Sequence, residues 1–170
     1  AQRMFFVATA PLAASGHVNL SPKGLDAFRV LGPRTVAYLD FVGSGAETIA
    51  HIRENRRIVI LFCAFEGRPR IVRLHGSGEI LDPGSAGYRE IRHHFPESAS
   101  DRAVICTSVN RISDSCGFGV PRYRFEGHRD ELTDWAARKS PDALRQYQTD
   151  KNRISLDGLP AVTWIEDDAE

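Results

Sequence analysis

GHVNLSPKG at residues 16–24, TVAYLDFV at 35–42 and GSGAETIAHIREN at 43–55 are the stretches around which this chain is organised. The first predicts a short strand that ends in polar residues, and the second predicts a more apolar strand. The third predicts a glycine-flanked turn followed by a helix. Ser44 and Glu47 have the spacing of a capping box, in which each side chain satisfies a backbone N–H at the helix start.

The first turn of that helix suits an anion, because it concentrates backbone donors and the positive end of the helix dipole. Hydroxyl and ammonium donors of Ser21, Lys23, Ser44 and Thr48 would add to the same place. We interpret the region as a site for a phosphate-bearing cofactor that lies across the two strands. The alternative is a well-capped surface helix that follows a buried strand.

Length and composition describe an ordinary globular protein. The 170 residues favour one domain, residues 1–170, large enough to bury roughly two-thirds of its unfolded surface. The 22 basic residues balance the 22 acidic ones. A nucleic-acid-binding surface needs a clear basic excess, so this charge balance argues against a nucleic-acid partner.

The three cysteines, Cys63, Cys106 and Cys116, lack the paired spacing of a zinc site or a redox motif. Their odd number predicts reduced thiols in a cytoplasmic protein. No apolar run is long enough for a membrane span, and no signal-peptide pattern opens the chain. The chain has no initiating Met and begins within a residue or two of a strand, so we expect a further N-terminal segment.

Histidines do not predict a metal site. His93 and His94 are adjacent, so they project to different sides of their helix. We expect His51 to be a solvated helix residue and Trp135 to lie in the core. We therefore assign no metal ligand.

Alternating and continuous apolar runs predict a mostly β protein with peripheral helices. Residues 25–33 are expected to be a connector, and Gly76 and Gly78 predict either strong bending of their strand or a close backbone approach. The strands form a small antiparallel barrel over about 4–115, and a helical C-terminal part covers about 129–160. The predicted strands are 4–10, 17–21, 35–42, 58–65, 71–81 and 102–112. The predicted helices are 45–55, 84–95, 130–139 and one capped by Ser140-Pro141.

The order of these pieces resembles the pyridoxamine 5'-phosphate oxidase-like family, the FMN-binding split barrels. The resemblance is carried by MFFVATA…GHVNLSPKG, TVAYLDF, GSGAETIAHIREN, IVILFCAF and IVRLHGSGEIL. NLSPKG, YLD, GSG-x-ET and SCG-(aromatic)-G are similar to a bacterial branch of unassigned substrate. The resemblance implies a six-stranded antiparallel split barrel of Greek-key type, and a homodimer with FMN at its interface.

By the same resemblance, the phosphate would be held by Lys23 together with Ser44, Gly45 and Thr48. The residues along the ring and the ribityl chain would be Asn19, Leu20 and Ser21. The residues beneath the isoalloxazine would be Tyr38, Leu39 and Asp40. Arg73 matches a strand arginine near the flavin or the partner subunit. We expect the Asn19 amide and backbone N–H groups near Ser21 to stabilise charge on the reduced ring.

Two departures from the family pattern argue against synthesis of pyridoxal phosphate. Gly43-Ser44-Gly45 stands where such oxidases have Ser-Arg-Lys, and the tail 154–160 reads ISLDGLP instead of carrying basic residues. The expected function is therefore an FMN-dependent oxidoreductase that acts on an unknown small molecule, with no catalytic residue assigned. The alternative is a protein that binds a flavin, a deazaflavin or a tetrapyrrole without turnover, as a carrier or sensor.

Two roles stay open at this point. Asp40 is either a simple turn-former or a flavin ligand. Cys116 is either a reactive thiol near the flavin or a buried, inert residue, and we favour the latter.

Overall fold

The computed structural model describes residues 2–165, and its strands make one antiparallel sheet. The described strands are β1 Phe5–Thr9, β2 Asn19–Lys23, β3 Phe28–Gly32, β4 Thr35–Phe41, β5 Arg57–Cys63, β6 Ile71–Leu81 and β7 Asp101–Ser115. The described helices are α1 Glu47–Asn55, α2 Ala86–Arg92, α3 Glu131–Ala137 and α4 Pro141–Asn152. Within this range, no helix is both long and apolar enough to cross a bilayer.

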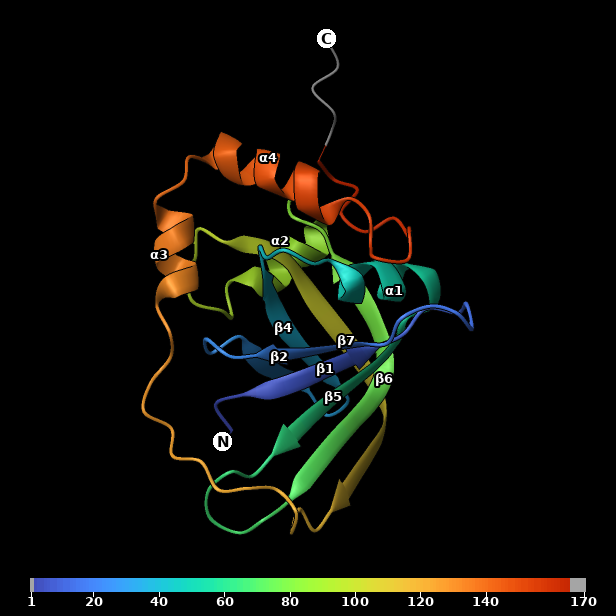
Figure 1. The fold of residues 1–170 in the computed structure, drawn as a ribbon, viewed down its shortest axis with the longest axis vertical. Coiled ribbons are helices and arrows are strands. Elements are labelled where there is room, and N and C mark those ends of the chain that lie inside the picture. The colour runs from blue at the N-terminus through green and yellow to red at the C-terminus, as the bar shows by residue number, and fades with distance from the viewer. Residues whose placement is uncertain (1, 166–170) are drawn as a thin grey trace.

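The sheet runs in the order β2-β1-β5-β6-β7-β4-β3 and curls on itself (Figure 1). Its two edges approach each other, because Phe28 of β3 contacts Phe5 of β1 at 5.3 Å and Phe62 of β5 at 5.0 Å between ring centroids. No ladder joins β2 to β3 in the described part of the chain. The result is a barrel that is open along one seam, which confirms the predicted mostly β split-barrel fold.

The chain reaches β5 from β4 through α1, and then makes the β5-β6-β7 meander that brings β7 beside β4. This placement of the fourth strand beside the first is the Greek-key arrangement. Figure 1 shows α1 and α4 over one end of the barrel and α3 at its side. The polar ends of β2 and β4 and the start of α1 are thereby brought to the seam.

The number of strands differs from the prediction of six. Residues 28–32, expected to be part of a connector, form β3 and pair with β4. Gly32-Pro33 was interpreted as the end of a loop, but Pro33 and Arg34 form the two-residue connection of a β3–β4 hairpin. Phe28 then adds its ring to the aromatic cluster inside the barrel, which gives this short strand its apolar anchor.

The close backbone approach predicted in β6 is confirmed at Gly76. A Cβ at Gly76 would stand 2.4 Å from the Ser108 carbonyl oxygen of β7, so only glycine allows this approach of the two strands. The β6–β7 register shifts between His75 and Gly76, which marks an irregularity at the same point. A Cβ at Gly78 would lie 2.9 Å from Ile52 of α1. The absence of a side chain at Gly78 therefore lets α1 pack closely on the barrel.

Helix starts follow the sequence signals unevenly. The Ser140 hydroxyl accepts from the Ala143 N–H and Pro141 opens α4, as predicted. In contrast, the N-cap of α1 is Ala46, which makes no side-chain cap bond. The predicted capping box of Ser44 and Glu47 is therefore wrong.

Two predictions about burial are also wrong. His51 is fully buried, because the face of α1 that carries it packs on β1. Trp135 is only half-buried and pairs with Tyr147 of α4 at 4.9 Å, outside both apolar clusters of the core.

Candidate cofactor site

The alternation of β2 decides which of its side chains reach the seam. Asn19, Ser21 and Lys23 are paired with Thr9, Val7 and Phe5 of β1, whose side chains are buried in the barrel. Because successive residues of a strand face opposite ways, Leu20 and Pro22 point outward. Leu20 is 66% exposed. The NLSPK strand therefore presents one polar inner row and one apolar outer row.

A buried ionic cluster lies on the inner side of the seam. The Lys23 Nζ donates to Asp40 Oδ1 at 2.9 Å, and the Arg102 Nε donates to Asp40 Oδ2 at 2.8 Å. Asp40 is 1% exposed, and Arg102 is also buried. Two cations around one carboxylate give this cluster a formal charge of +1.

The charge state of Asp40 follows from its neighbours. Burial alone would raise the pKa of the Asp40 carboxyl, but the charges of Arg102 and Lys23 and their hydrogen bonds outweigh burial and lower that pKa below its ordinary value. Asp40 is therefore a fixed anion rather than a simple turn-former. The Lys23 amine is correspondingly committed to a partner within the chain.

A second polar group lies toward α1. The Asn19 Nδ2 donates to the hydroxyl of Thr9 at 3.1 Å and to that of Thr48 at 2.9 Å. The Thr9 hydroxyl also bonds His51 Nδ1 at 3.0 Å. Both amide hydrogens of Asn19 are thus used inside the protein, which leaves its Oδ1 acceptor for a ligand.

Tyr38 lies between the ionic cluster and the Asn19 group. The Lys23 Nζ stands 5.9 Å from the centre of its ring. Burial raises the pKa of Tyr38 well above its ordinary value, a direction that the neighbouring Thr48 hydroxyl opposes only weakly. The phenol oxygen is buried and makes no hydrogen bond of acceptable geometry to any described residue. A polar atom in that state is either tolerated at a cost or satisfied by a bound molecule.

The start of α1 connects to the same network. The Arg102 Nη1 donates to the Gly45 carbonyl at 2.7 Å, so the turn before α1 is fastened to the ionic cluster. Ser44 and Gly45 are exposed, and a Cβ at Gly45 would meet nothing within 4 Å. Ala46 makes no side-chain cap bond, so the N-cap residue does not satisfy the backbone donors of the first turn.

The tail of the chain secures this turn from the other side. The Asn152 Nδ2 donates to the Gly43 carbonyl at 2.8 Å, and the Leu156 N–H donates to the Glu47 carboxylate at 2.9 Å. Glu47 is therefore occupied by the tail, which explains why it does not close a capping box. The His17 backbone N–H donates to Asp157 Oδ2 at 2.8 Å, and His17 Nδ1 lies 2.6 Å from Asp157 Oδ1, so these contacts hold the tail against the approach to β2.

The structure brings most of the predicted site residues together but not all of them. Those at the seam or the start of α1 are Asn19, Ser21, Lys23, Tyr38, Asp40, Ser44, Gly45 and Thr48. Leu39 points to the opposite face of β4 and packs in the cluster beneath α2. Arg73 lies on β6, three strands from β2, and bonds the Ser115 hydroxyl.

Three expectations require correction. Lys23 is the last residue of β2, whereas Thr48 of α1 contacts Asn19 at the first residue of β2, and the strand extends about 13 Å at roughly 3.3 Å per residue. Lys23 bonds Asp40 and Thr48 bonds Asn19, so the two side chains do not grip one phosphate between them. The Asn19 amide presents an acceptor rather than a donor, and Cys116 is exposed rather than buried.

Arg102, Thr9 and His51 are members of the site that the sequence interpretation missed. Arg102 had a signal, because it is the one cation at the start of an otherwise apolar strand. Thr9 and His51 had none, since their partners lie ten to forty-two residues away. Within residues 2–165, no group of three or more His, Cys, Asp or Glu side chains has the arrangement of a metal site.

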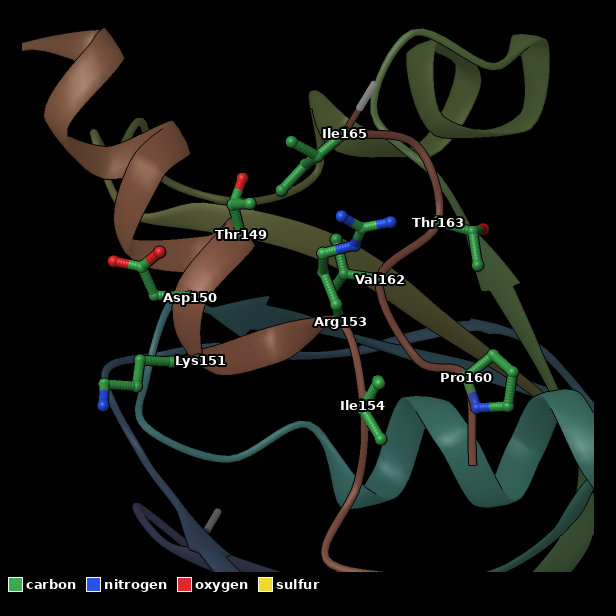
Figure 2. Close-up of a pocket in the computed structure, with 9 residues that line it drawn as sticks. All are labelled: Thr149, Asp150, Lys151, Arg153, Ile154, Pro160, Val162, Thr163 and Ile165. Atoms are coloured by element: carbon green, nitrogen blue, oxygen red, sulfur yellow. The ribbon is translucent and has the colours of Figure 1, made fainter. Parts of the chain in front are cut away.

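Figure 2 shows a different hollow, of about 680 Å³, between the end of α4 and the tail. Its labelled residues come from 149–165, and none is among the predicted site residues. This hollow is therefore lined by the end of α4 and the tail and not by the residues of the seam.

Comparison with known proteins gives one strong sequence relative. No family model matches the chain. The chain is 40% identical, over an alignment of 179 positions, to the pyridoxamine 5'-phosphate oxidase family protein ustO of Aspergillus flavus. The alignment covers 95% of this chain and 71% of that relative.

Among solved structures, HupZ of Group A Streptococcus superposes with a TM-score of 0.51 at 25% identity, over 67% of this chain and 86% of HupZ. A crystal structure of a putative pyridoxamine 5'-phosphate oxidase from Lactobacillus delbrueckii superposes with a TM-score of 0.48 at 18% identity, over 65% of this chain and 84% of that one.

Proposed function

Because the chain belongs to the pyridoxamine 5'-phosphate oxidase family, we propose that it is an FMN-binding oxidoreductase acting on a small molecule. The observation that carries the proposal is the polar seam, where the +1 cluster of Lys23, Asp40 and Arg102 lies beside the uncapped start of α1. A fixed positive charge next to free backbone donors is the chemistry that a phosphate needs. The exposed turn at Ser44 and Gly45 gives it access.

The residues present fit a flavin in two further respects. The buried Tyr38 oxygen has no partner of good geometry among described residues, and Asn19 keeps one acceptor for an N–H donor. In the proposed complex the Ser44 hydroxyl and the α1 backbone hold the phosphate. Lys23 acts through Asp40 and Arg102, by fixing the charge beneath the turn, instead of touching the phosphate itself.

A flavin supplies hydride and electron transfer, so the chain needs no nucleophile of its own. The residues of the chain bind and orient. Arg102 holds the Gly45 carbonyl and thereby the shape of the turn, and Thr48 and Thr9 hold the Asn19 amide in one orientation. Asp40 stays ionised and keeps both cations in place.

We further propose that the protein works as a homodimer with the flavin at the interface, in the cytoplasm. Exposed apolar side chains next to the seam support a partner there, since Val18 and Leu20 are 75% and 66% exposed. The free cysteines Cys63, Cys106 and Cys116 support a reducing compartment.

An absorption spectrum of the purified protein and a fluorescence titration test the cofactor assignment. We expect bound flavin, with FMN binding more tightly than riboflavin, which lacks the phosphate. Ser44→Ala is expected to weaken the binding of FMN by about 0.5–1.5 kcal/mol and to leave the binding of riboflavin unchanged. Ser108→Ala, at an exposed serine of β7, is the matched control. The proposal would be overturned if the purified protein is colourless and its addition quenches the fluorescence of neither FMN nor riboflavin.

Binding without turnover is the competing function. Oxidation of NADH or NADPH by the flavin-loaded protein, followed by absorbance, separates an oxidoreductase from a carrier or sensor. Analytical ultracentrifugation with and without FMN tests the dimer. A monomer that still binds FMN tightly would contradict an interface site while leaving the flavin assignment intact.

A further inference from the structure

His51 is a titratable side chain that the fold buries completely. Its exposed fraction is 0%, and α1, which carries it, lies over the end of the barrel where β1 ends (Figure 1). Its Nδ1 lies 3.0 Å from the hydroxyl oxygen of Thr9. Its Nε2 is buried and makes no hydrogen bond to any residue of 2–165. Because each ring nitrogen of a neutral histidine is either a donor or an acceptor, the direction of the Thr9 bond depends on where the ring carries its proton.

The Glu47 carboxylate indicates which ring nitrogen of His51 carries the proton. Glu47 lies one turn before His51 on α1, and its Oε2 stands 3.9 Å from Nε2. That separation is too long for a hydrogen bond, but a negative charge on this side of the ring attracts a proton to Nε2. Asp157 of the tail is a further carboxylate whose charge interacts with His51. The geometry therefore favours the neutral ring with its proton on Nε2 and a free electron pair on Nδ1.

A proton on Nε2 fixes the hydrogen bonds of Thr9. A hydroxyl group has one proton to donate. Since Nδ1 then has only an electron pair, the Thr9 hydroxyl donates its proton to His51. The Thr9 oxygen can then only accept from its second partner, the Asn19 Nδ2 at 3.1 Å. The direction of the first bond thus sets the direction of the second.

Asn19 is the residue on which this direction acts. With its Nδ2 bonded to Thr9 and, at 2.9 Å, to Thr48, the amide is left with Oδ1 as its group for a ligand. The reverse orientation would present two N–H donors to a ligand, and it requires Thr9 to donate to Oδ1. His51 prevents that orientation for as long as its Nδ1 takes the Thr9 proton.

We propose that His51 is a positioning residue, which acts through Thr9 to hold the Asn19 amide with its acceptor, and not its donors, toward the ligand. The site then selects a ligand group that donates an N–H or O–H at this point, because two acceptors facing each other would leave both without a hydrogen bond. The inference rests on the proposed function for the identity of that ligand as a flavin. A flavin has such donors in one ring N–H and in the hydroxyls of its ribityl chain.

The proton of His51 is located in the flavin-free protein. Nitrogen-15 NMR of histidine-labelled protein at neutral pH reports which ring nitrogen is protonated, and His51→Asn assigns the signals. We expect a proton on Nε2 and none on Nδ1. We also expect the Asn19 side-chain protons to exchange slowly with solvent, and at least one of them to exchange at least tenfold faster in Thr9→Val. A proton on Nδ1, or unchanged exchange in that variant, overturns the proposal.

Flavin titrations test whether this orientation serves the ligand. Thr9→Val removes the hydroxyl with little change of shape, and is expected to weaken the binding of FMN and of riboflavin at least threefold. The two factors should be equal, because Asn19 does not hold the phosphate. Thr9→Ser keeps a hydroxyl and should bind both flavins to within twofold of the wild type. A loss for FMN alone, or a serine variant as weak as the valine variant, overturns the proposal.

Thr107→Val is the matched control for the loss of a buried hydroxyl. Thr107 of β7 is fully buried, and its hydroxyl has no hydrogen-bond partner within the described part of the chain. We expect its flavin affinities to equal those of the wild type. A loss as large as that of Thr9→Val would mean that any change of this kind in the barrel disturbs the site, and would overturn the positioning role.

Two substitutions test His51 itself. His51→Leu removes the acceptor and is expected to weaken both flavins at least threefold. His51→Asn should bind them more tightly than His51→Leu, because the Oδ1 of asparagine is as many bonds from the backbone as Nδ1 and can accept from Thr9. Equal affinities in the two variants overturn the proposal. If circular dichroism shows that His51→Leu does not fold, the Thr9→Val and Thr9→Ser pair decides.

These measurements separate the positioning role from the proposed function. If the wild type binds FMN and Thr9→Val binds it equally well, the positioning role is wrong and the flavin assignment stands. If the wild type binds no flavin, the flavin assignment is wrong. The NMR measurements on the flavin-free protein then decide alone whether His51 orients Asn19.

Discussion

The two faces of β4 solve burial in opposite ways. On one face, Tyr38 and Asp40 point toward the seam, where Asp40 bonds Lys23 and Arg102 and the Lys23 ammonium stands 5.9 Å from the centre of the Tyr38 ring. On the other face, Ala37 and Leu39 pack beneath α2 in a wholly apolar cluster with Val104. The exposed fraction of each of these four residues is at most 1%.

The two faces of β4 differ in how much their burial contributes to stability. An apolar cluster gains stability from every methylene that it buries. A buried carboxylate with two cations at best offsets its own desolvation. The polar face of β4 is therefore better explained by ligand binding than by stability, and the following changes test that contrast.

The largest expected effect comes from breaking the ionic cluster. Arg102→Met leaves Asp40 buried with Lys23 alone and removes the donor to the Gly45 carbonyl. We expect the free energy of unfolding, measured in urea, to fall by about 3–5 kcal/mol. Arg111→Met, at an exposed position of β7, is the control. A loss below about 1 kcal/mol would mean that the cluster is not a structural unit.

The next effect comes from the apolar face. Leu39→Ala creates a cavity under α2 and is expected to cost about 2–4 kcal/mol by the same measurement. Since Leu39 points away from the seam, FMN affinity should stay unchanged at temperatures where the variant is folded. Leu20→Ala, at a 66% exposed leucine, should change stability by less than about 0.5 kcal/mol. Loss of FMN affinity in the Leu39→Ala variant would mean that packing on the apolar face of β4 also influences binding at the seam.

Acid should weaken the polar face selectively. The pKa of Asp40 is lower in the folded protein than the ordinary value near 3.9, so the unfolded chain binds its proton first as the pH falls. The stability due to its charge is fully present above about pH 4 and is lost as the pH drops toward the folded pKa. The free energies of unfolding of wild type and Asp40→Asn are measured in urea from pH 6 to pH 2.5. The difference between the two should become smaller below pH 4. A constant difference would contradict this.

The smallest effect is expected at Tyr38. Its hydroxyl has no good hydrogen-bond partner among residues 2–165, so Tyr38→Phe should change the unfolding free energy by less than about 1 kcal/mol. A measurable fall in FMN affinity with unchanged stability would assign the oxygen to the ligand. A larger loss of stability would instead reveal an internal hydrogen bond.

Local sequence patterns predicted most of the fold, but few of the hydrogen bonds and ion pairs of the candidate site. The strand at 71–81 and the close backbone approach at Gly76 were predicted from alternation and glycine placement, both of which are local signals. β3 was missed because Gly32-Pro33 is a punctuation signal that a hairpin turn and a loop share. The choice between them depends on pairing with β4.

The sequence predicted most of the residues that form the site, but not which of them bond to each other. The NLSPKG and GSGAET motifs brought most of the right residues to attention, but no spacing rule joins Asp40 to Arg102, sixty-two residues apart. Likewise, Glu47 has the position of a capping residue, yet it bonds Leu156 from the tail. Long-range partners therefore reassigned side chains whose local role was plausible.

The fastening of the α1 turn by the tail has a consequence for biosynthesis. Asn152 and Leu156 follow every strand of the barrel in the sequence, yet they hold Gly43 and Glu47. During translation the strands can pair while this corner is still unclamped, because its clamp leaves the ribosome after β7. A nascent chain stalled before residue 152 would thus carry a complete sheet and an unfinished corner.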